Sequence, residues 1–285
     1  MMNTPRVLSV AGSDPSGGAG IQADLKAMSA CGAYAMTVIT ALTAQSTKGV
    51  AGVHPVPVDF VRAQLDTLLD DITPNATKIG MLASRELAEV VGEYLQRLDN
   101  VVLDPVMVAT SGDSLLAPDA IDTVRELCTK VDLITPNMAE AAVLLDCAVA
   151  ATPDDLCAQA QALMDMGVRR VIVKGGHLDN VATDVYADED GISLITAERI
   201  NTCNTHGTGC SLSGAIAALR PATSTWYEAV ARAKHYLTGA IGAADSLALG
   251  HGNGPVQHFY ELWSCARDTV GTTLSFPTIP ARTIR

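Results

Sequence analysis

Residues 204–210 read NTHGTGC and lead directly into the helix-like stretch SLSGAIAALR. The first N–H groups of a helix have no partner within it and lie at the positive end of its dipole, so a glycine-rich turn here suits a phosphate. Cys210 at such a helix start would have its thiolate stabilised, which makes it a candidate proton acceptor. The alternative is a small-residue helix start with a buried, inert cysteine, and the heptad alone does not separate the two.

Composition limits the classes of ligand. The 285 residues are 48% hydrophobic, enough for one large α/β domain or two small ones. There are 31 acidic residues against 19 basic ones, and no cluster of lysine and arginine offers a stripe for a nucleic-acid backbone. Nucleic acid is therefore not an expected partner. Anion binding must be local, through oriented N–H groups and one or two placed cations.

The cysteines and the apolar runs indicate a cellular setting. Seven cysteines are scattered without a CxxC pair, which is typical of reduced thiols. The N-terminal segment MMNTPRVLSVAG lacks the pattern of an export signal, and no run of about 18 apolar residues predicts a membrane span. We expect a cytoplasmic protein without a membrane partner.

Short β-rich runs alternate with amphipathic helical patterns. The strand-like runs, several of them apolar throughout, cover residues 6–12, 35–42, 77–81, 100–106, 132–136 and 169–175. The helical patterns cover residues 58–71, 84–99, 117–128 and 153–167, and residues 182–200 suggest a hairpin. The alternation predicts an α/β fold, a mostly parallel sheet with helices on both faces. We expect one domain over residues 1–265 and a C-terminal tail over residues 266–285.

Ligands of open α/β sheets bind beyond the carboxyl ends of the strands, and the first strand ends in AGSDPSGGAG (11–20). This segment is not a P-loop, because Gly17 is followed by Gly18 and Ala19 rather than by lysine. It also lacks the GxGxxG spacing of dinucleotide-binding folds. What remains is a turn into a helix, which can be simple βα-turn chemistry.

Seven blocks, in order, resemble the hydroxymethylpyrimidine/phosphomethylpyrimidine kinase family of the ribokinase-like superfamily. They are AGSDPSGGAGIQADLK (11–26), KIGM (78–81), LDPVMVATSGDSLL (103–116), LITPNMAEA (133–141), VKGGH (173–177), NTHGTGCSLSGAIAA (204–218) and GHGNGPVQHF (250–259). The resemblance implies a ribokinase-like three-layer α/β/α sandwich, often a homodimer. It also implies ATP-dependent phosphorylation of 4-amino-5-hydroxymethyl-2-methylpyrimidine, and then of its monophosphate, in thiamine biosynthesis.

In this family the turn of Gly207, Thr208 and Gly209 forms an anion hole over the transferred phosphate, and we expect Thr205 and His206 to line it. Cys210 occupies the place where sugar kinases of the superfamily carry a catalytic aspartate. Our hypothesis is that a thiol, neutral or charged as required, serves a two-step kinase. An alcohol nucleophile needs a base, whereas a phosphate nucleophile would be repelled by an obligate carboxylate.

The resemblance also implies sites for ATP and Mg²⁺. Lys174 would contact the ATP phosphates, although it could be only a solvated lysine at a strand end. Asn137 and Glu140 fit a magnesium and phosphate site, and they are also spaced as a capping box, so both roles can coexist. Glu140 would hold Mg²⁺ through water, with Asp104 a second candidate.

For the substrate, Gln45 follows a strand-like run where the family places a pyrimidine-contacting glutamine or glutamate. Its amide can accept from the exocyclic amine and donate to a ring nitrogen. Otherwise it is a surface glutamine in a hairpin. Gly12, Asp24, Met81 and Val108 would complete the pocket, although Met81 and Val108 could be ordinary core residues and Asp24 a helix-start carboxylate. Residues 109–116 resemble a loop that covers the substrate.

Two other functions remain open from the sequence. A pyridoxal or pyridoxine kinase shares the fold and takes a similar substituted nitrogen heterocycle. A non-catalytic pyrimidine-binding sensor would retain the pocket, but it has no need of the turn at 207–210, Lys174 or Glu140. A second phosphorylation, giving a diphosphate, separates the first alternative from our interpretation.

Overall fold

The computed structural model describes residues 4–107, 115–176 and 181–263. Within these ranges the strands form one nine-stranded sheet in the order β3-β2-β1-β4-β5-β6-β7-β8-β9. The strands are β1 (Arg6–Ser13), β2 (Tyr34–Ser46), β3 (Gly49–Pro55), β4 (Ala76–Ile79), β5 (Val101–Leu103), β6 (Leu133–Ile134), β7 (Val171–Val173), β8 (Val181–Asp188) and β9 (Gly191–Glu198). Six neighbouring strands run parallel, namely β2, β1, β4, β5, β6 and β7. At the two edges the pairing is antiparallel, between β3 and β2, between β8 and β7, and between β9 and β8.

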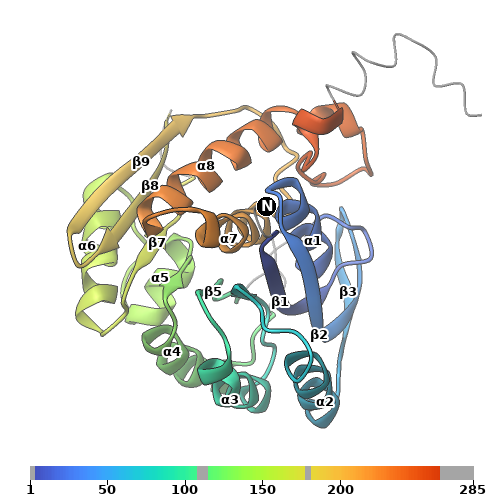
Figure 1. The fold of residues 1–285 in the computed structure, drawn as a ribbon. Coiled ribbons are helices and arrows are strands. Elements are labelled where there is room, and N and C mark those ends of the chain that lie inside the picture. The colour runs from blue at the N-terminus through green and yellow to red at the C-terminus, as the bar shows by residue number, and fades with distance from the viewer. Residues whose placement is uncertain (1–3, 108–114, 177–180, 264–285) are drawn as a thin grey trace, which may run out of the picture.

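Helices cover both faces of the sheet (Figure 1). The helices are α1 (Gly20–Ala30), α2 (Val58–Leu69), α3 (Arg85–Tyr94), α4 (Ile121–Lys130), α5 (Met138–Leu145), α6 (Pro153–Asp165), α7 (Thr208–Leu219) and α8 (Trp226–Gly242). Short 3-10 turns η1 (Leu95–Arg97), η2 (Pro118–Ala120), η3 (Arg220–Ala222) and η4 (Ala244–Leu247) extend several of them. The predicted three-layer sandwich is confirmed.

Two hydrophobic cores, one on each face, account for the apolar strands. In β1, Leu8 packs in the core beneath α2 to α6, whereas its neighbour Val7 packs in the core beneath α1, α7 and α8. Successive side chains of a strand point to opposite faces, so a strand buried on both faces must be apolar at every position. The predicted strands and helices therefore appear close to their expected places, and residues 182–200 form the β8–β9 hairpin as expected.

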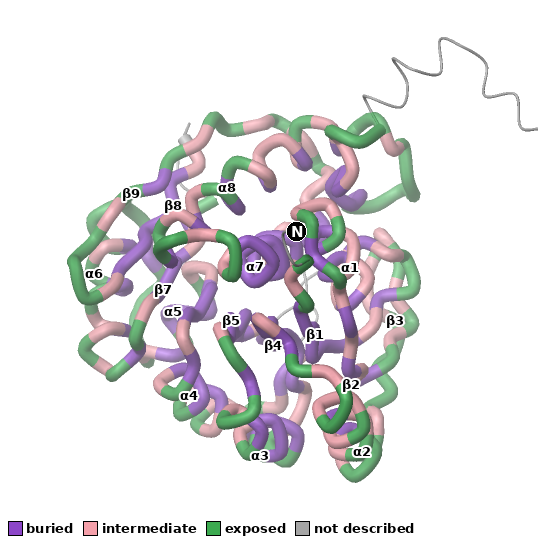
Figure 2. The backbone as a smooth tube through the Cα atoms, viewed as in Figure 1, coloured by how far each residue is buried: buried purple, intermediate pink, exposed green. Residues whose placement is uncertain are grey.

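Helix α7 is the most deeply enclosed helix beside the site. All residues from Ser211 to Leu219 are buried, and Figure 2 shows this helix in purple between α1 and α8. Small side chains allow this close packing, because Gly214 lies against the Asp24 backbone of α1. The N-terminus of α7 is thus held rigidly at the centre of the molecule.

Some expectations lie outside the described residues, and others differ from the structure. Val108, most of the loop at 109–116 and the tail at 266–285 are outside the described ranges. Strand β3 and helix α8 were not among the predicted elements, and β2 continues to Ser46, so Gln45 lies within a strand rather than after one.

Candidate active site

Two turns meet backbone to backbone at the carboxyl end of the sheet. One, at residues 14–19, joins β1 to α1, and the other precedes α7. Gly207, the N-cap of α7, has a φ of 76°, and a Cβ there would collide with the carbonyl oxygen of Gly18. Only glycine allows both this backbone conformation and this close approach. The turn at 204–207 is therefore fixed against the turn that follows β1.

The N-terminus of α7 is a suitable anion site. Gly207 has no side chain to cap the helix, and the Thr208 N–H makes only a long 3.3 Å bond to the Thr205 carbonyl. The N–H groups of Gly209 and Cys210 have no acceptor within the helix by its geometry. The structure thus brings together the predicted residues Gly207, Thr208, Gly209 and Cys210 at one helix start.

The Cys210 thiol differs from the sequence expectation. Burial raises its pKa to about 11, and the carboxylates of Asp24 and Asp104 also raise it, against Lys78 and a backbone hydrogen bond from Gly20. The expected lowering by the helix N-terminus is outweighed, because desolvation and two negative charges act at the same site. The thiol of the free protein is therefore neutral near pH 7.

Lys174 and Asp104 lie against the same helix start. The Nζ of Lys174 is 3.0 Å from Oδ1 of Asp104, which also accepts from Thr135 at 2.9 Å. A Cβ added to Gly209 would lie 3.1 Å from Lys174 Nζ. Lys174 is largely buried rather than a solvated strand-end residue, with a side-chain exposure of 17%. Desolvation disfavours its charge, but Asp104 and Glu140 raise its pKa overall. A fixed cation therefore stands beside the free N–H groups.

Asn137 and Glu140 form the predicted capping box at the start of α5. The Asn137 side chain accepts from the Glu140 N–H at 2.9 Å, and Glu140 Oε2 accepts from the Asn137 N–H at 2.8 Å. Burial raises the pKa of Glu140 to about 7, and Asp104 adds to the rise while Lys174 opposes it. A bound cation would relieve this unfavourable buried charge.

Mg²⁺ generally uses one or two carboxylates together with substrate phosphates and water. Among the described residues no group of three or more His, Cys, Asp or Glu side chains could hold a metal by itself. Glu140 and Asp104, both of which interact with the charge of Lys174, fit the sparser donor set that Mg²⁺ prefers.

A buried ion pair beside Cys210 was missed from the sequence. Lys78 Nζ lies 2.8 Å from Oδ2 of Asp24, both side chains are fully buried, and Ser9 donates to the same oxygen. The signal was present, because Lys78 is a charged residue within the predicted strand at 77–81, which forms β4. The Asp24 carboxylate is fully buried beside Lys78, and its predicted contact with the substrate stays a prediction.

Gln45 lines a cavity of about 340 Å³ together with His206 and residues 46–49 and 252–253. Gln45 Nε2 and His206 Nε2 are 3.4 Å apart, although 161 positions separate the two residues. Gly12 and Met81 pack on one another, since a Cβ on Gly12 would lie 3.1 Å from Met81 Sδ, and Met81 is buried. Gln45 is half-buried in the β2–β3 hairpin, so its hairpin location is right and it also faces a cavity.

His206 makes contacts that the sequence did not indicate. Its backbone N–H donates to the Gly254 carbonyl at 3.0 Å, and its Nε2 is 2.8 Å from Oδ2 of Asp14, while its place at the phosphate stays a prediction. Asp14, not identified from the sequence, further accepts from Ser16 and Ala19. Desolvation would raise the pKa of Asp14, but the hydrogen bonds from His206, Ser16 and Ala19 lower it to about 2.

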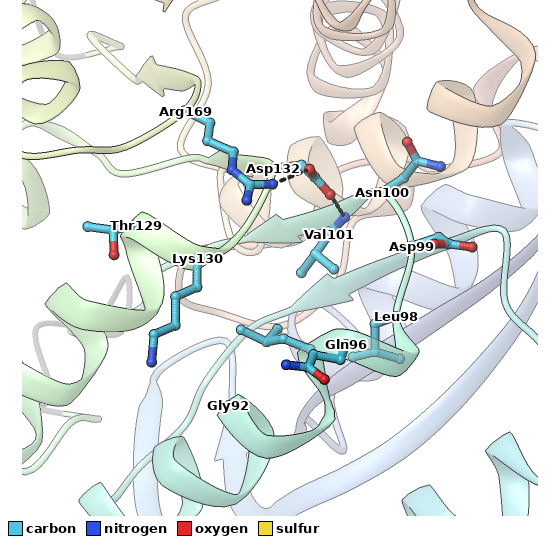
Figure 3. A pocket seen from close by; sticks show the side chains of 11 residues that line it. Gly92, Gln96, Leu98, Asp99, Asn100, Val101, Thr129, Lys130, Asp132 and Arg169 are labelled. Atoms are coloured by element: carbon cyan, nitrogen blue, oxygen red, sulfur yellow. Dashed lines mark hydrogen bonds and ion pairs between the residues drawn. The ribbon is translucent and has the colours of Figure 1, made fainter.

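A larger cavity, of about 720 Å³, lies at the opposite end of the sheet (Figure 3). Its wall includes Val101 at the start of β5, and Asp132 and Arg169, which precede β6 and β7. Asp132 accepts from the Val101 N–H at 2.8 Å and pairs with Arg169 at 3.3 Å (Figure 3). These charges are engaged in joining strand ends. The candidate site therefore remains at the carboxyl ends, where Asp104, Lys174 and α7 converge.

Within the described ranges, no helix is both long and apolar enough to span a membrane. The six described cysteines are free thiols.

The chain is similar to known proteins over most of its length. The family model for phosphomethylpyrimidine kinase matches residues 14–257. The hydroxymethylpyrimidine/phosphomethylpyrimidine kinase of Escherichia coli K12 is 52% identical, covering 92% of this chain and 100% of its own. That of Rhizobium meliloti is 49% identical, over 91% and 99%. A probable thiamine biosynthetic bifunctional enzyme of Oryza sativa is 42% identical over 96% of this chain and 51% of its own.

Solved structures share the fold. An ADP complex of Bacillus subtilis pyridoxal kinase superposes with a TM-score of 0.83 at 33% identity, covering 92% of this chain and 100% of that one. The phosphomethylpyrimidine kinase of Clostridium difficile 630 gives a TM-score of 0.73 at 37% identity, over 84% and 100%. The fold is thus the ribokinase-like one, and the chain belongs to the phosphomethylpyrimidine kinase family.

Proposed function

We propose that the protein phosphorylates 4-amino-5-hydroxymethyl-2-methylpyrimidine with ATP, and then phosphorylates the monophosphate to the diphosphate, in thiamine biosynthesis. The observation that carries this proposal is the start of α7, where open N–H groups, Cys210 and the Lys174–Asp104 pair converge. The names of the bacterial relatives and of the rice relative support the substrate and the pathway.

Phosphoryl transfer depends mainly on positioning and on neutralising charge. The N–H groups of Gly209 and Cys210 would stabilise the transferred phosphoryl group at the positive end of α7. Lys174, fixed by Asp104, would supply a point charge beside it, and Asn137 and Thr205 would complete the ATP phosphate site. The family resemblance and the place of Lys174 beside Gly209 support this arrangement.

The neutral thiol of Cys210 affects the first step. With a pKa of about 11, Cys210 is almost entirely protonated near pH 7, and a protonated thiol cannot accept another proton. Only its thiolate form could take the hydroxymethyl proton. In a loose transition state the nucleophile bears little charge until late, so this transfer to the thiolate would come late, as the new bond forms. In the second step the nucleophile is an ionised phosphate oxygen, and a neutral thiol does not repel it.

Mg²⁺, when bound with ATP, would neutralise the phosphate charge. Glu140 would hold it, through water, with Asp104 as the second carboxylate, and the raised pKa of buried Glu140 supports this role. We further propose a homodimer in the cytoplasm. The family resemblance supports the dimer, and the free cysteines support a reducing compartment.

A coupled assay that measures ADP release tests the proposal with two nucleophiles, the pyrimidine alcohol and its monophosphate. We expect turnover of both and a diphosphate as the final product. Turnover of neither compound would refute the proposal.

Pyridoxal kinase is the second candidate, because the pyridoxal kinase of B. subtilis superposes with a TM-score of 0.83. Pyridoxal in the same assay separates the two functions: efficient conversion of pyridoxal to a monophosphate, without turnover of the pyrimidine, would favour this candidate. A non-catalytic sensor would consume no ATP with either heterocycle.

A further inference from the structure

The hydrogen-bond network around Gln45 contains two conflicts that together fix the orientation of its side-chain amide. Asp14 Oδ2 is 2.8 Å from His206 Nε2, and it also accepts from the N–H groups of Gly18 and Ala19. A carboxylate can only accept, so His206 Nε2 must carry a proton. With the Gln45 nitrogen 3.4 Å from this same Nε2, two donors face each other.

The second conflict lies on the other side of the amide. Thr43 Oγ1 is 2.8 Å from the Ser13 carbonyl oxygen and 3.1 Å from Gln45 Oε1. Both neighbours are acceptors, but a hydroxyl has one proton to donate. The shorter contact, to Ser13, takes that proton and leaves a lone pair of Thr43 facing Gln45.

A half-turn of the carboxamide exchanges its oxygen and nitrogen and removes both conflicts. The oxygen then accepts from His206 Nε2–H, and the nitrogen donates to Thr43 Oγ1. We infer that His206, held by Asp14, and Thr43 lock the Gln45 amide with its oxygen toward His206, so that its free edge selects a ring nitrogen beside an exocyclic amine in one orientation. These are positioning residues, and the inference rests on the proposed function.

The lock has a direct consequence for the reacting group. The free edge of the amide presents an acceptor on the His206 side and a donor on the Thr43 side. A 4-aminopyrimidine must therefore place its amine toward His206 and its ring nitrogen toward Thr43. The hydroxymethyl group on the carbon next to the amine-bearing carbon then lies further toward His206. Since His206 directly precedes Gly207, the N-cap of α7, this orientation directs the hydroxyl toward the transfer site.

The lock can be tested without substrate. In protein labelled with ¹⁵N-histidine and ¹⁵N-glutamine, long-range ¹H–¹⁵N spectra report which ring nitrogen of His206 is protonated, with His206→Asn for assignment. We expect a proton on Nε2 and nuclear Overhauser contacts from the Gln45 amide protons to the Thr43 methyl group. An Nε2 without a proton overturns the inference, and so do nuclear Overhauser contacts from the Gln45 amide protons to the His206 ring.

Kinetics test the selectivity with a matched pair of variants, Thr43→Val and Thr43→Ser. Thr43→Val removes the acceptor, so we expect KM for the aminopyrimidine to rise about tenfold with kcat little changed, whereas Thr43→Ser keeps wild-type values. The 4-oxo analogue presents donor and acceptor in the reverse order. Thr43→Val should therefore lower the ratio of kcat/KM for the amino compound to kcat/KM for the oxo compound by about tenfold, because the Gln45 amide can then turn.

If Thr43→Val lowers kcat/KM equally for the amino and the oxo compound, their ratio is unchanged. That result contradicts the locked amide and indicates a merely structural role for Thr43. Wild-type protein that phosphorylates neither compound refutes the proposed function instead. In that case the NMR measurement still decides the amide orientation.

Discussion

The buried pair of Lys78 and Asp24 gives a prediction that can be worked out from the structure. Both side chains are fully buried and their charged atoms are 2.8 Å apart. At an effective dielectric constant of about 20, the attraction between the two charges is about 6 kcal/mol. Desolvation offsets much of it, but removing one partner leaves the other charge buried alone. We expect Lys78→Met to lower the free energy of unfolding by about 3–5 kcal/mol near pH 7.

The loss should depend on pH. Desolvation already raises the pKa of Asp24, and Lys78 and Ser9 oppose the rise, so removing Lys78 raises this pKa further. A carboxyl with a higher pKa in the folded than in the unfolded state loses stability as pH rises between the two values. The penalty of Lys78→Met should therefore be larger at about pH 8 than at about pH 5, by up to about 1.4 kcal/mol per pH unit.

Urea unfolding followed by circular dichroism, at both pH values, measures these effects. The double variant Asp24→Asn/Lys78→Met carries no buried charge at this pair, and should be more stable than Lys78→Met alone. Arg62→Met is the control, because the Arg62–Glu93 pair is exposed and should contribute little to stability. The reasoning fails if Lys78→Met lowers the free energy of unfolding no more than Arg62→Met does. It also fails if the loss in the double variant equals the sum of the losses in Asp24→Asn and Lys78→Met alone.

Three further predictions concern the reaction. Cys210→Asp should impair phosphorylation of the monophosphate at least about tenfold more than that of the alcohol, because a fixed carboxylate repels a phosphate nucleophile; equal losses in single-turnover assays would contradict this. Gly209→Ala would put a Cβ 3.1 Å from Lys174 Nζ and should lower kcat/KM about 100-fold, whereas Gly52→Ala, with open space around it, should not; similar rates for both would place the transfer site elsewhere. Ionised Glu140 is needed for Mg²⁺, so wild-type activity at limiting Mg²⁺ should rise with pH through about 7, and Glu140→Gln should lose this rise; a pH profile unchanged in Glu140→Gln would exclude the role.

The layers of the fold could be predicted because burial on two faces leaves a clear trace in the sequence. Apolar runs such as the one in β1 must be buried on both sides, and alternation with amphipathic helices then requires a covered parallel sheet. Strand β3 was not predicted because it is an exposed edge strand, and its sequence GVAGVHP lacks a buried face that would give a periodic pattern. An edge strand is specified mainly by its neighbour, β2, rather than by its own residues.

The site residues also differ in how far they could be predicted from the sequence. Gly207, Gly209 and Cys210 were predicted because a glycine turn at a helix start has a local signature. Lys78 and Asp14 were missed because their roles depend on partners far away in the chain, Asp24 and His206. His206 was assigned to the phosphate on sequence adjacency alone, and only the folded chain places its Nε2 between Asp14 and Gln45.

Cys210 shows most clearly what a local motif leaves out. The helix start favours a thiolate, but the pKa of this thiol depends on everything that surrounds it in space. Burial and the carboxylates of Asp24 and Asp104 raise the pKa, and the cation Lys78 lowers it. Since Lys78 also neutralises Asp24, the same ammonium stabilises the core and limits the negative field at the sulfur. Lys78→Met should therefore slow alkylation of Cys210 by iodoacetamide at a given pH, whereas Arg62→Met should leave its rate unchanged. The rate is followed peptide by peptide in folded protein. Faster alkylation in Lys78→Met would mean that the lysine does not act on this thiol.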